Sequence, residues 1–141
     1  MSKFFKINVS VIIFDKNNRV LVQKRAMTED VFPGLYGIPG GTVEMTDVSL
    51  DDALAREVAE EVGVKIKETF LLKNNIKKKE MYAMLYLVYT AEHDSGEAMP
   101  MDETESVQWL DKKAVENLSF TPTTMETIML AYERRNTSSS V

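Results

Sequence analysis

Along the chain, stretches of β-branched and aromatic residues alternate with polar turns, a pattern typical of strands. Five segments predict strands: residues 4–15, 19–25, 64–76, 80–92 and 106–110. The first two are expected to pair as a hairpin through the turn at 16–18. Residues 64–76 are expected to be interrupted near 73–75, and 80–92, which is apolar on both faces, predicts a central strand.

The clearest helix is predicted over residues 50–62, which are rich in strong helix formers. Ser49 is a good N-cap with Asp52 as the acid three residues later, and Gly63 stands where helices commonly end. Four residues are expected to turn towards the core: Leu54, Ala55, Val58 and Val62.

Two loops and a short helix fill the intervening segments. Residues 26–46 hold four of the six glycines and two of the four prolines. A loop this long inside a compact domain is usually functional. A polar loop is expected over 93–105, and a short helix over 111–118.

The C-terminal part predicts one more helix and completes the fold class. A capping box of Thr123 and Glu126 predicts a last helix that runs to about Arg135. Strands on both sides of one helix, with a second helix at the end, indicate an α+β fold in which a mixed sheet is sandwiched between helices. We expect one domain over residues 1–136, followed by a disordered tail over 137–141.

The composition narrows the chemistry. With 141 residues, 44% of them hydrophobic and 28% charged, the chain has enough apolar material for one globular core. It contains no cysteine and a single histidine, His93, which excludes disulfides, thiol nucleophiles, cysteine–zinc sites and histidine-based triads within one chain. Hydrolytic chemistry must therefore rest on carboxylates, hydroxyls, lysines or a bound metal.

Net charge and hydropathy limit the kinds of partner that the chain is expected to bind. A net charge of −5 gives the surface no general attraction for a polyanion, so neither DNA nor RNA is expected as a partner. No apolar stretch approaches the roughly 20 residues that span a bilayer, so no membrane association is expected. Residues 1–18 hold an apolar run that alternates with polar residues and lacks a cleavage site. This run predicts a strand and not a signal peptide, and hence a cytoplasmic protein.

Three glutamates give the predicted helix an acidic side. Glu57, Glu60 and Glu61, at spacings of three and four residues, share an arc of roughly 100°. Ala53 lies beside them, where a small side chain leaves room for a ligand. Like charges this close repel one another, and a divalent cation such as Mg²⁺ removes that penalty. A solvated acidic surface is the simpler interpretation, but the glycine-rich loop and the adjacent Arg56 favour metal-assisted attack of water on phosphorus.

The sequence GGTVEMTDVSLDDALAREVAEEVGV, residues 40–64, resembles the Nudix box, whose pattern is G-x5-E-x7-R-E-U-x-E-E-x-G-U with U aliphatic. Its second half matches at every fixed position: Arg56, Glu57, Val58, Glu60, Glu61, Gly63 and Val64. The box glycine is Gly41, and the resemblance covers about residues 5–135. It implies a MutT-like member of the Nudix family with the family's α/β/α sandwich fold.

The box departs from the family pattern at two points. Asp47 stands where the family has glutamate, and the stretch from there to Arg56 is one residue longer than the pattern. The extra residue falls in the loop before Ser49, so the register of the helix glutamates is expected to survive. Asp47 and Glu44 are the candidates for the role of the missing glutamate.

The resemblance implies roles for the matching residues. Glu57, Glu60 and Glu61 would bind the metal, with Mg²⁺ as the expected ion and Mn²⁺ as a substitute. Gly41 would add its backbone carbonyl to this set. Arg56 would orient the carboxylates through a salt bridge.

The base that activates the attacking water has three candidate sources. The family takes it from a box glutamate or from an acid in a later loop, where Glu103 and Glu105 stand in this chain. Glu103, six residues before Trp109, is favoured. A solvated loop charge is the simpler interpretation of either residue.

The expected substrate-binding residues are Arg25, Tyr36, Gly40 and Gly41. Arg25 closes a predicted strand and is a candidate to contact a phosphate, although a surface salt bridge explains it equally well. Tyr36 is a candidate to stack on a base, although packing in the core is the simpler role.

The resemblance implies hydrolysis of a nucleoside diphosphate linked to another group. A nucleoside triphosphate, including a modified one, is the first choice of substrate, and ADP-ribose or a nucleotide sugar is the second. A binding module that senses a nucleotide without cleaving it is the alternative from another class. A homodimer is expected only by analogy with relatives.

Overall fold

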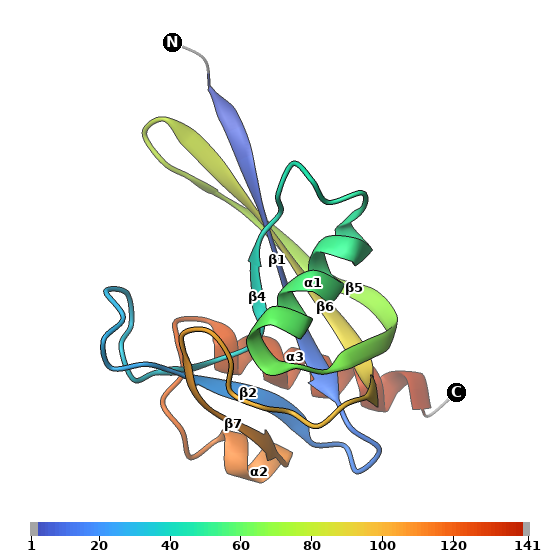
Figure 1. The fold of residues 1–141 in the computed structure, drawn as a ribbon. Helices are drawn as coiled ribbons and strands as arrows, with labels where there is room; N and C mark the ends of the chain where they lie inside the picture. Colours follow the sequence, from blue (N-terminus) through green and yellow to red (C-terminus); the bar gives the residue numbers. More distant parts are fainter. Residues whose placement is uncertain (1–2, 140–141) are drawn as a thin grey trace.

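The computed structural model describes residues 3–139, which form one mixed β-sheet with helices on both faces (Figure 1). Its elements, in chain order, are β1 (Phe4–Phe14), β2 (Val20–Arg25), β3 (Tyr36–Gly37), β4 (Gly40–Thr42), α1 (Leu50–Val62), β5 (Lys65–Lys78), β6 (Tyr82–Ser95), β7 (Thr104–Leu110), α2 (Lys112–Val115) and α3 (Thr124–Ser139). The strand order is β3-β2-β1-β6-β5, with β4 paired to β1 and β7 to β2. This arrangement confirms the predicted α+β sandwich. None of the helices in this part of the chain is long and apolar enough to cross a membrane.

Strand β1 organises the sheet because it pairs in both directions. It runs parallel to β6 from Phe4↔Tyr82 to Phe14↔Glu92, and antiparallel to β2 and β4. Strand β6 lies between β1 and β5, which confirms the prediction of a central strand. The first residues of β1 and the β5–β6 hairpin extend away from the body of the molecule as an arm (Figure 1).

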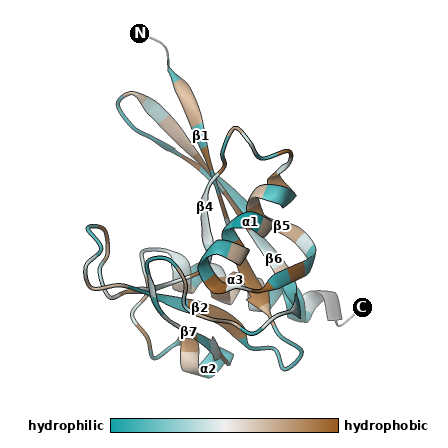
Figure 2. Ribbon diagram, in the orientation of Figure 1, coloured by the Kyte–Doolittle hydropathy of each residue, from teal (hydrophilic) through white to brown (hydrophobic). Residues whose placement is uncertain are grey.

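The two faces of the sheet carry separate hydrophobic cores. Successive residues of a strand point to opposite faces, so Val9 and Val11 pack with α1, whereas Ile12 and Phe14 pack with α3. In Figure 1, α1 lies in front of the sheet and α3 behind it. Figure 2 shows the hydrophobic residues of β1 and β2 gathered in the body of the molecule.

Helix α1 begins and ends where the sequence predicts. The Ser49 side chain accepts a hydrogen bond of 3.0 Å from the backbone N–H of Asp52. Gly63 ends the helix with a φ of 71°, a left-handed conformation that glycine adopts without strain.

The buried side of α1 differs from the prediction by one residue. Four residues are buried: Ala53, Leu54, Val58 and Val62. Ala55, which was expected in the core, is exposed. Ala53, which is expected to leave room for a ligand, is instead fully buried in the core that α1 forms with β1.

The predicted interruption of the strand near 73–75 is wrong. Strand β5 continues through this segment, where Lys73, Asn74 and Asn75 pair with consecutive residues of β6. The ladder offered by a central strand outweighs the low strand propensity of asparagine. The irregularities of β5 are register shifts before this segment, the last of them between Leu71 and Lys73. The loop expected over 93–105 is shorter in the structure. The strand before it, β6, ends at Ser95, and the strand after it, β7, begins at Thr104.

Helix α3 differs from the prediction at both ends. Thr123 has a φ of 66° and not the extended backbone of an N-cap, so the predicted capping box is wrong. The Thr123 carbonyl instead accepts hydrogen bonds from the N–H and hydroxyl of Thr127. The helix continues past Arg135 to Ser139 and takes in residues expected in the tail. Residues 140–141 lie outside the described residues.

Candidate active site

The acidic side of α1 packs against the glycine strand β4. The Gly40 backbone N–H donates a hydrogen bond of 2.9 Å to Glu61 Oε2. At Gly41 the approach is closer still, because a Cβ atom there would collide with the Glu57 carboxyl group. Glycine at position 41 therefore lets the strand backbone approach the Glu57 carboxylate, whereas a Cβ atom at Gly40 would collide with Val9 and Ser10 of β1.

Arg56 links the Asp47 carboxylate in the loop before α1 to the carboxylates of the helix. Its Nε and Nη2 donate to the two Asp47 oxygens, each at 2.9 Å. Its Nη1 donates to Glu57 at 3.0 Å and to Glu60 at 3.3 Å. Glu44, at 3.5 Å from Nη1, is the weaker partner, with a side chain 59% exposed against 6% for Asp47. The two-pronged contact with Arg56 lowers the pKa of Asp47 to about 2.

Glu61 carries a charge that its surroundings disfavour. Burial raises its pKa to about 7, although the Gly40 N–H and the Gln23 amide donate hydrogen bonds to it. The neighbouring charges of Glu57 and Asp102 raise this pKa further. No basic side chain within residues 3–139 forms an ion pair with Glu61. Burial also raises the pKa of Glu57.

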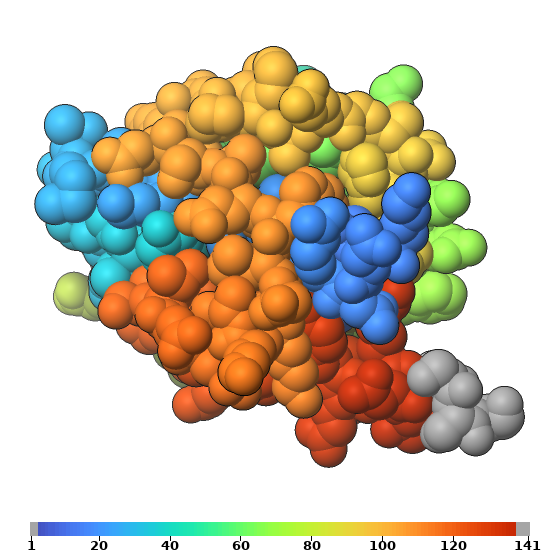
Figure 3. All heavy atoms as spheres, turned by 90° about the horizontal axis from the view of Figure 1, so that it is seen from below, coloured from blue at the N-terminus to red at the C-terminus, as the bar shows by residue number. Residues whose placement is uncertain are grey.

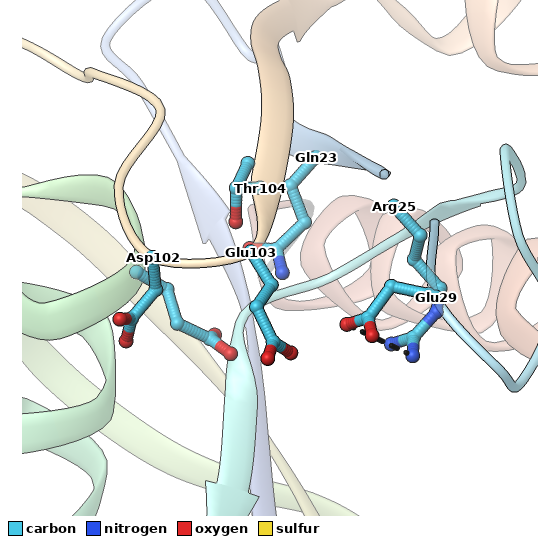
Figure 4. Close-up of a pocket in the computed structure, with 7 residues that line it drawn as sticks. Gln23, Arg25, Glu29, Asp102, Glu103 and Thr104 are labelled. Atoms are coloured by element: carbon cyan, nitrogen blue, oxygen red, sulfur yellow. Dashed lines mark ion pairs between the residues drawn. The ribbon is translucent and has the colours of Figure 1, made fainter. Parts of the chain in front are cut away.

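A polar cleft of about 320 Å³ opens beside Glu61. It is lined by Gln23, Arg25, Glu29, Glu61, Asp102, Glu103 and Thr104. Figure 4 shows Glu103 between Asp102 and the Arg25–Glu29 ion pair. The cleft lies where the loop after β2 meets the loop before β7, and the Ala26 N–H donates to the Glu103 carbonyl at 3.3 Å. The same two loops adjoin on the surface in Figure 3.

The two candidate bases from the later loop occupy different places. Glu103 lines the cleft, whereas Glu105 pairs with Lys24 at 3.2 Å outside it. A hydrogen bond with Glu29 raises the pKa of Glu103, because two carboxyl groups can share such a bond only when one is protonated. Glu29 also contacts Arg25 at 3.5 Å. The structure thus brings Arg25 and Glu103 into one cleft and leaves Glu105 outside it.

Tyr36 does not line this cleft. Its ring packs against Phe120, with ring centroids 6.0 Å apart, and its hydroxyl accepts a hydrogen bond of 3.4 Å from Gln108. It belongs to the partly buried residues around the core beneath α3. This position agrees with the packing role that the sequence left open.

Four residues of the cleft are not among those that the sequence predicts: Gln23, Glu29, Asp102 and Thr104. The sequence could have indicated Gln23. It lies two residues after the buried Leu21 and so on the same side of β2, at the point where the residues of this strand change from apolar to polar. Its Oε1 atom is buried without a hydrogen-bond partner in the described part of the chain. Nothing in the sequence indicates Glu29 or Asp102, because a charged residue in a loop is ordinarily solvated.

The residues present fit a divalent cation. The donors are carboxylate and carbonyl oxygens, the ligands that Mg²⁺ prefers. Within residues 3–139, no three acidic or histidine side chains already form a closed ligand group. Glu57 and Glu60 are drawn to Arg56, while Glu61 is held by Gly40, so the three carboxylates share a side of the helix without converging.

Comparison with known proteins establishes the class. A profile of the NUDIX domain matches residues 4–130, and the chain belongs to the NUDIX family. It is therefore a metal-dependent hydrolase of phosphoric anhydride bonds, with MutT-like relatives. The inference drawn from the Nudix box is confirmed.

Individual relatives are distant. The chain is 25% identical over 123 residues to the nucleoside triphosphatase NudI of Enterobacter sp. (strain 638), covering 79% of this chain and 86% of that protein. It is 30% identical over 115 residues to the NAD-capped RNA hydrolase NudC of Chromobacterium violaceum, covering 80% of this chain but 41% of that protein.

Solved structures share the fold at low identity. The NUDIX domain of Shewanella oneidensis NrtR complexed with ADP ribose has a TM-score of 0.78 at 22% identity, over 91% of this chain and 86% of that chain. The MutT protein from Methanosarcina mazei Go1 has a TM-score of 0.73 at 20% identity, over 96% and 98% of the two chains.

The Gly41→Ala substitution is expected to weaken Mg²⁺ binding by about tenfold or more, because the added methyl group takes the place of the Glu57 carboxyl. Isothermal titration with Mg²⁺ measures the effect. Gly37→Ala is the matched control, since a Cβ there meets only Thr121 at 3.8 Å, an ordinary contact. Equal Mg²⁺ affinities of the two variants would contradict this account of Gly41.

The Glu61→Gln substitution is expected to change how the stability of the metal-free protein depends on pH. The pKa of Glu61 is raised from 4.5 to about 7 on folding, so the folded chain holds a proton that the unfolded chain has lost. Wild-type stability therefore falls as the pH rises from about 5 to 7. Glutamine removes this fall and stabilises the chain at pH 8 by on the order of 1–2 kcal/mol.

Urea unfolding at pH 5.5 and pH 8 with EDTA measures this difference. Asp47, whose pKa is lowered to about 2, stays ionised at both pH values and adds no slope between them. The idea fails if wild type and Glu61→Gln lose stability in parallel as the pH rises.

Proposed function

We propose that the chain hydrolyses a diphosphate bond in a nucleoside diphosphate linked to another group, with a nucleoside triphosphate, including a modified one, as its substrate. One observation carries the proposal: Glu57 and Glu61 meet the backbone of β4 at the edge of a cleft that also holds Arg25 and Glu103. Carboxylates alone would repel a polyphosphate, so the site needs a cation to accept this substrate.

The proposed metal ligands are Glu57, Glu60, Glu61 and the Gly41 carbonyl. When bound, Mg²⁺ neutralises phosphate oxygens and lowers the pKa of a coordinated water. Arg56 is the proposed positioning residue, because its Nη1 contacts Glu57 and Glu60 while its other nitrogens are fixed on Asp47. In this proposal Asp47 takes the role of the glutamate that the family has at this position.

Glu103 is the proposed general base, and Arg25 the proposed phosphate contact. The side chain of Glu29 lies between them, paired with Arg25 and hydrogen-bonded to Glu103. A phosphate at Arg25 would replace the Glu29 carboxylate. Loss of the shared hydrogen bond would lower the pKa of Glu103 and so favour the carboxylate that accepts a proton from water.

Two relatives support this choice of substrate. The NudI relative, which this chain matches over most of its length, is a nucleoside triphosphatase. ADP-ribose is the second candidate, because the NrtR domain that shares this fold binds it. A nucleotide sensor that does not cleave is the alternative from another class, and both the membership of a hydrolase family and the presence of all three helix glutamates speak against it.

The Glu60→Gln substitution is expected to reduce turnover by roughly a hundredfold or more, because a neutral amide is a weaker metal ligand. The variant should fold normally, since the Glu60 side chain is 50% exposed. Chelation by EDTA should abolish wild-type turnover. Glu133→Gln, an exposed position on α3, is the matched control and should keep full activity. Near-normal turnover of Glu60→Gln would overturn the proposed metal site.

A substrate panel with Mg²⁺ and mass-resolved products distinguishes the candidates. We expect a nucleoside monophosphate and pyrophosphate from a standard or modified nucleoside triphosphate. Release of AMP from ADP-ribose, with the triphosphates intact, would favour the second candidate. Tight Mg²⁺-dependent binding without any product would favour the sensor.

A further inference from the structure

The arm of the sheet carries a charge opposite to that of the whole chain. We define the basic arm as residues 3–7 and 73–86. It holds six lysines, Lys3, Lys6, Lys73, Lys77, Lys78 and Lys79, and one acid, Glu80, a net charge of +5 in a chain whose total is −5. The arm projects from the body of the molecule and includes none of the residues proposed for hydrolysis (Figure 1).

Strand register gathers aromatic rings on one face of the basic arm. Val88 of β6 packs in the core beneath α3, and side chains alternate along a strand, so Tyr82 and Tyr86 face the same side. Phe4 lies opposite Tyr82 on β1, and the two rings stack with centroids 5.7 Å apart. Lys6 occupies the same face, with its Nζ 4.8 Å from the centre of the Tyr82 ring.

Lysines of β5 lie on the same face, along the edge of the sheet opposite to β1. Lys77 pairs with Met84, and Lys73 pairs with Val88, so both lysines share the side of Tyr86. The rings on β1 and β6 therefore lie between Lys6 on one strand and two lysines on another.

The tip of the basic arm is hollowed. A cleft of about 290 Å³ is lined by Lys3, Phe4, Phe5, Lys78, Lys79, Glu80, Tyr82 and Ala83. Phe4 is 51% exposed and Phe5 is 62% exposed, so aromatic surface and ammonium groups stand together in water. The combination suits a ligand that offers both negative charge and flat apolar faces.

Edge protection, self-association and membrane binding each account for only part of this pattern. Lysines protect an exposed edge strand from pairing. This explains the lysines on β5 and at the start of β1, where β1 pairs with β6 but not with β2 or β4, but it does not explain the rings beside them. A second copy of the arm would bring lysines against lysines, which repel. An anionic membrane would attract the lysines and the exposed Phe4 and Phe5, but it would leave the partly buried rings of Tyr82 and Tyr86 without a role.

We propose that the basic arm binds single-stranded nucleic acid, with phosphates along the lysines and bases against the rings of Phe4, Tyr82 and Tyr86. Cations that follow a backbone, combined with aromatic rings that accept any base, define such sites. The net charge of the chain led to the opposite expectation, but binding of a polyanion depends on the local potential.

Fluorescence anisotropy with labelled oligo(U) and oligo(dT) of about 12 nucleotides tests the proposal. EDTA keeps the hydrolytic site inactive, so the result is independent of the proposed hydrolysis. Reversing Lys6, Lys73 and Lys77 to glutamate should weaken binding at least tenfold at low salt. It should also reduce the slope of log K against log salt by about 2, since each phosphate contact with a single strand contributes about 0.7.

A matched variant reverses Lys16, Lys112 and Lys113, which are exposed outside the arm and change the net charge equally. It should bind within about threefold of wild type. Both reversal variants should keep hydrolytic activity and unfold near the wild-type temperature.

The rings are tested separately from the charges. Tyr82→Ala with Tyr86→Ala should weaken binding about tenfold, whereas phenylalanine at both positions should preserve it, because stacking needs the ring alone. Stronger binding of oligo(U) would identify RNA as the ligand, and equal binding would identify the single strand itself; either supports the proposal. Equal losses in the two charge-reversal variants, preference for a duplex, or binding to phosphatidylserine vesicles but to neither oligonucleotide would overturn it.

Discussion

The close packing of α1 on β4 is the contact on which the candidate site depends. Gly40 and Gly41 bring the strand backbone against Glu61 and Glu57, and the small Ala53 lets the same side of the helix settle into the core. The apolar residues of the helix thus pack in the core, while its carboxylates contact the backbone of β4. A larger side chain at Gly41 would displace the Glu57 carboxyl group, and one at Gly40 would collide with the backbone of β1, on which β4 packs.

Arg56 resolves part of the repulsion that this packing creates. Its contacts with Asp47, Glu57 and Glu60 offset several negative charges at once. Glu61 lies beyond its reach, and burial disfavours the ionised form of that residue. The unbalanced charge of the acidic helix is therefore concentrated where the helix meets the cleft, and this is where a cation would stabilise the folded protein most.

The local parts of this site could be predicted, and the parts that depend on distant segments could not. Helical spacing and the Ser49 and Gly63 caps are short-range features, so the position of Glu57 was readable from the chain. The pairing of Asp47 with Arg56 settles which of the two candidate acids makes the close contact, but only the folded loop shows it. The meeting of Glu29 with Glu103 joins loops more than 70 residues apart, and neither loop has a pattern that indicates the other. The predicted break of β5 failed for a related reason, since pairing with β6 overrides the local preference of asparagine.

Topology also decides what the charge of the chain means. A net charge of −5 describes the surface only if acids and bases are mixed evenly. The parallel pairing of β1 with β6 places the lysines at the start of the chain beside those of a hairpin some 70 residues later. Acids are meanwhile gathered on α1 and in the cleft between the end of β2 and the start of β7. One sheet therefore carries an acidic surface suited to bind a cation and, apart from it, a basic surface formed by lysines. The net charge of the whole chain reveals neither surface.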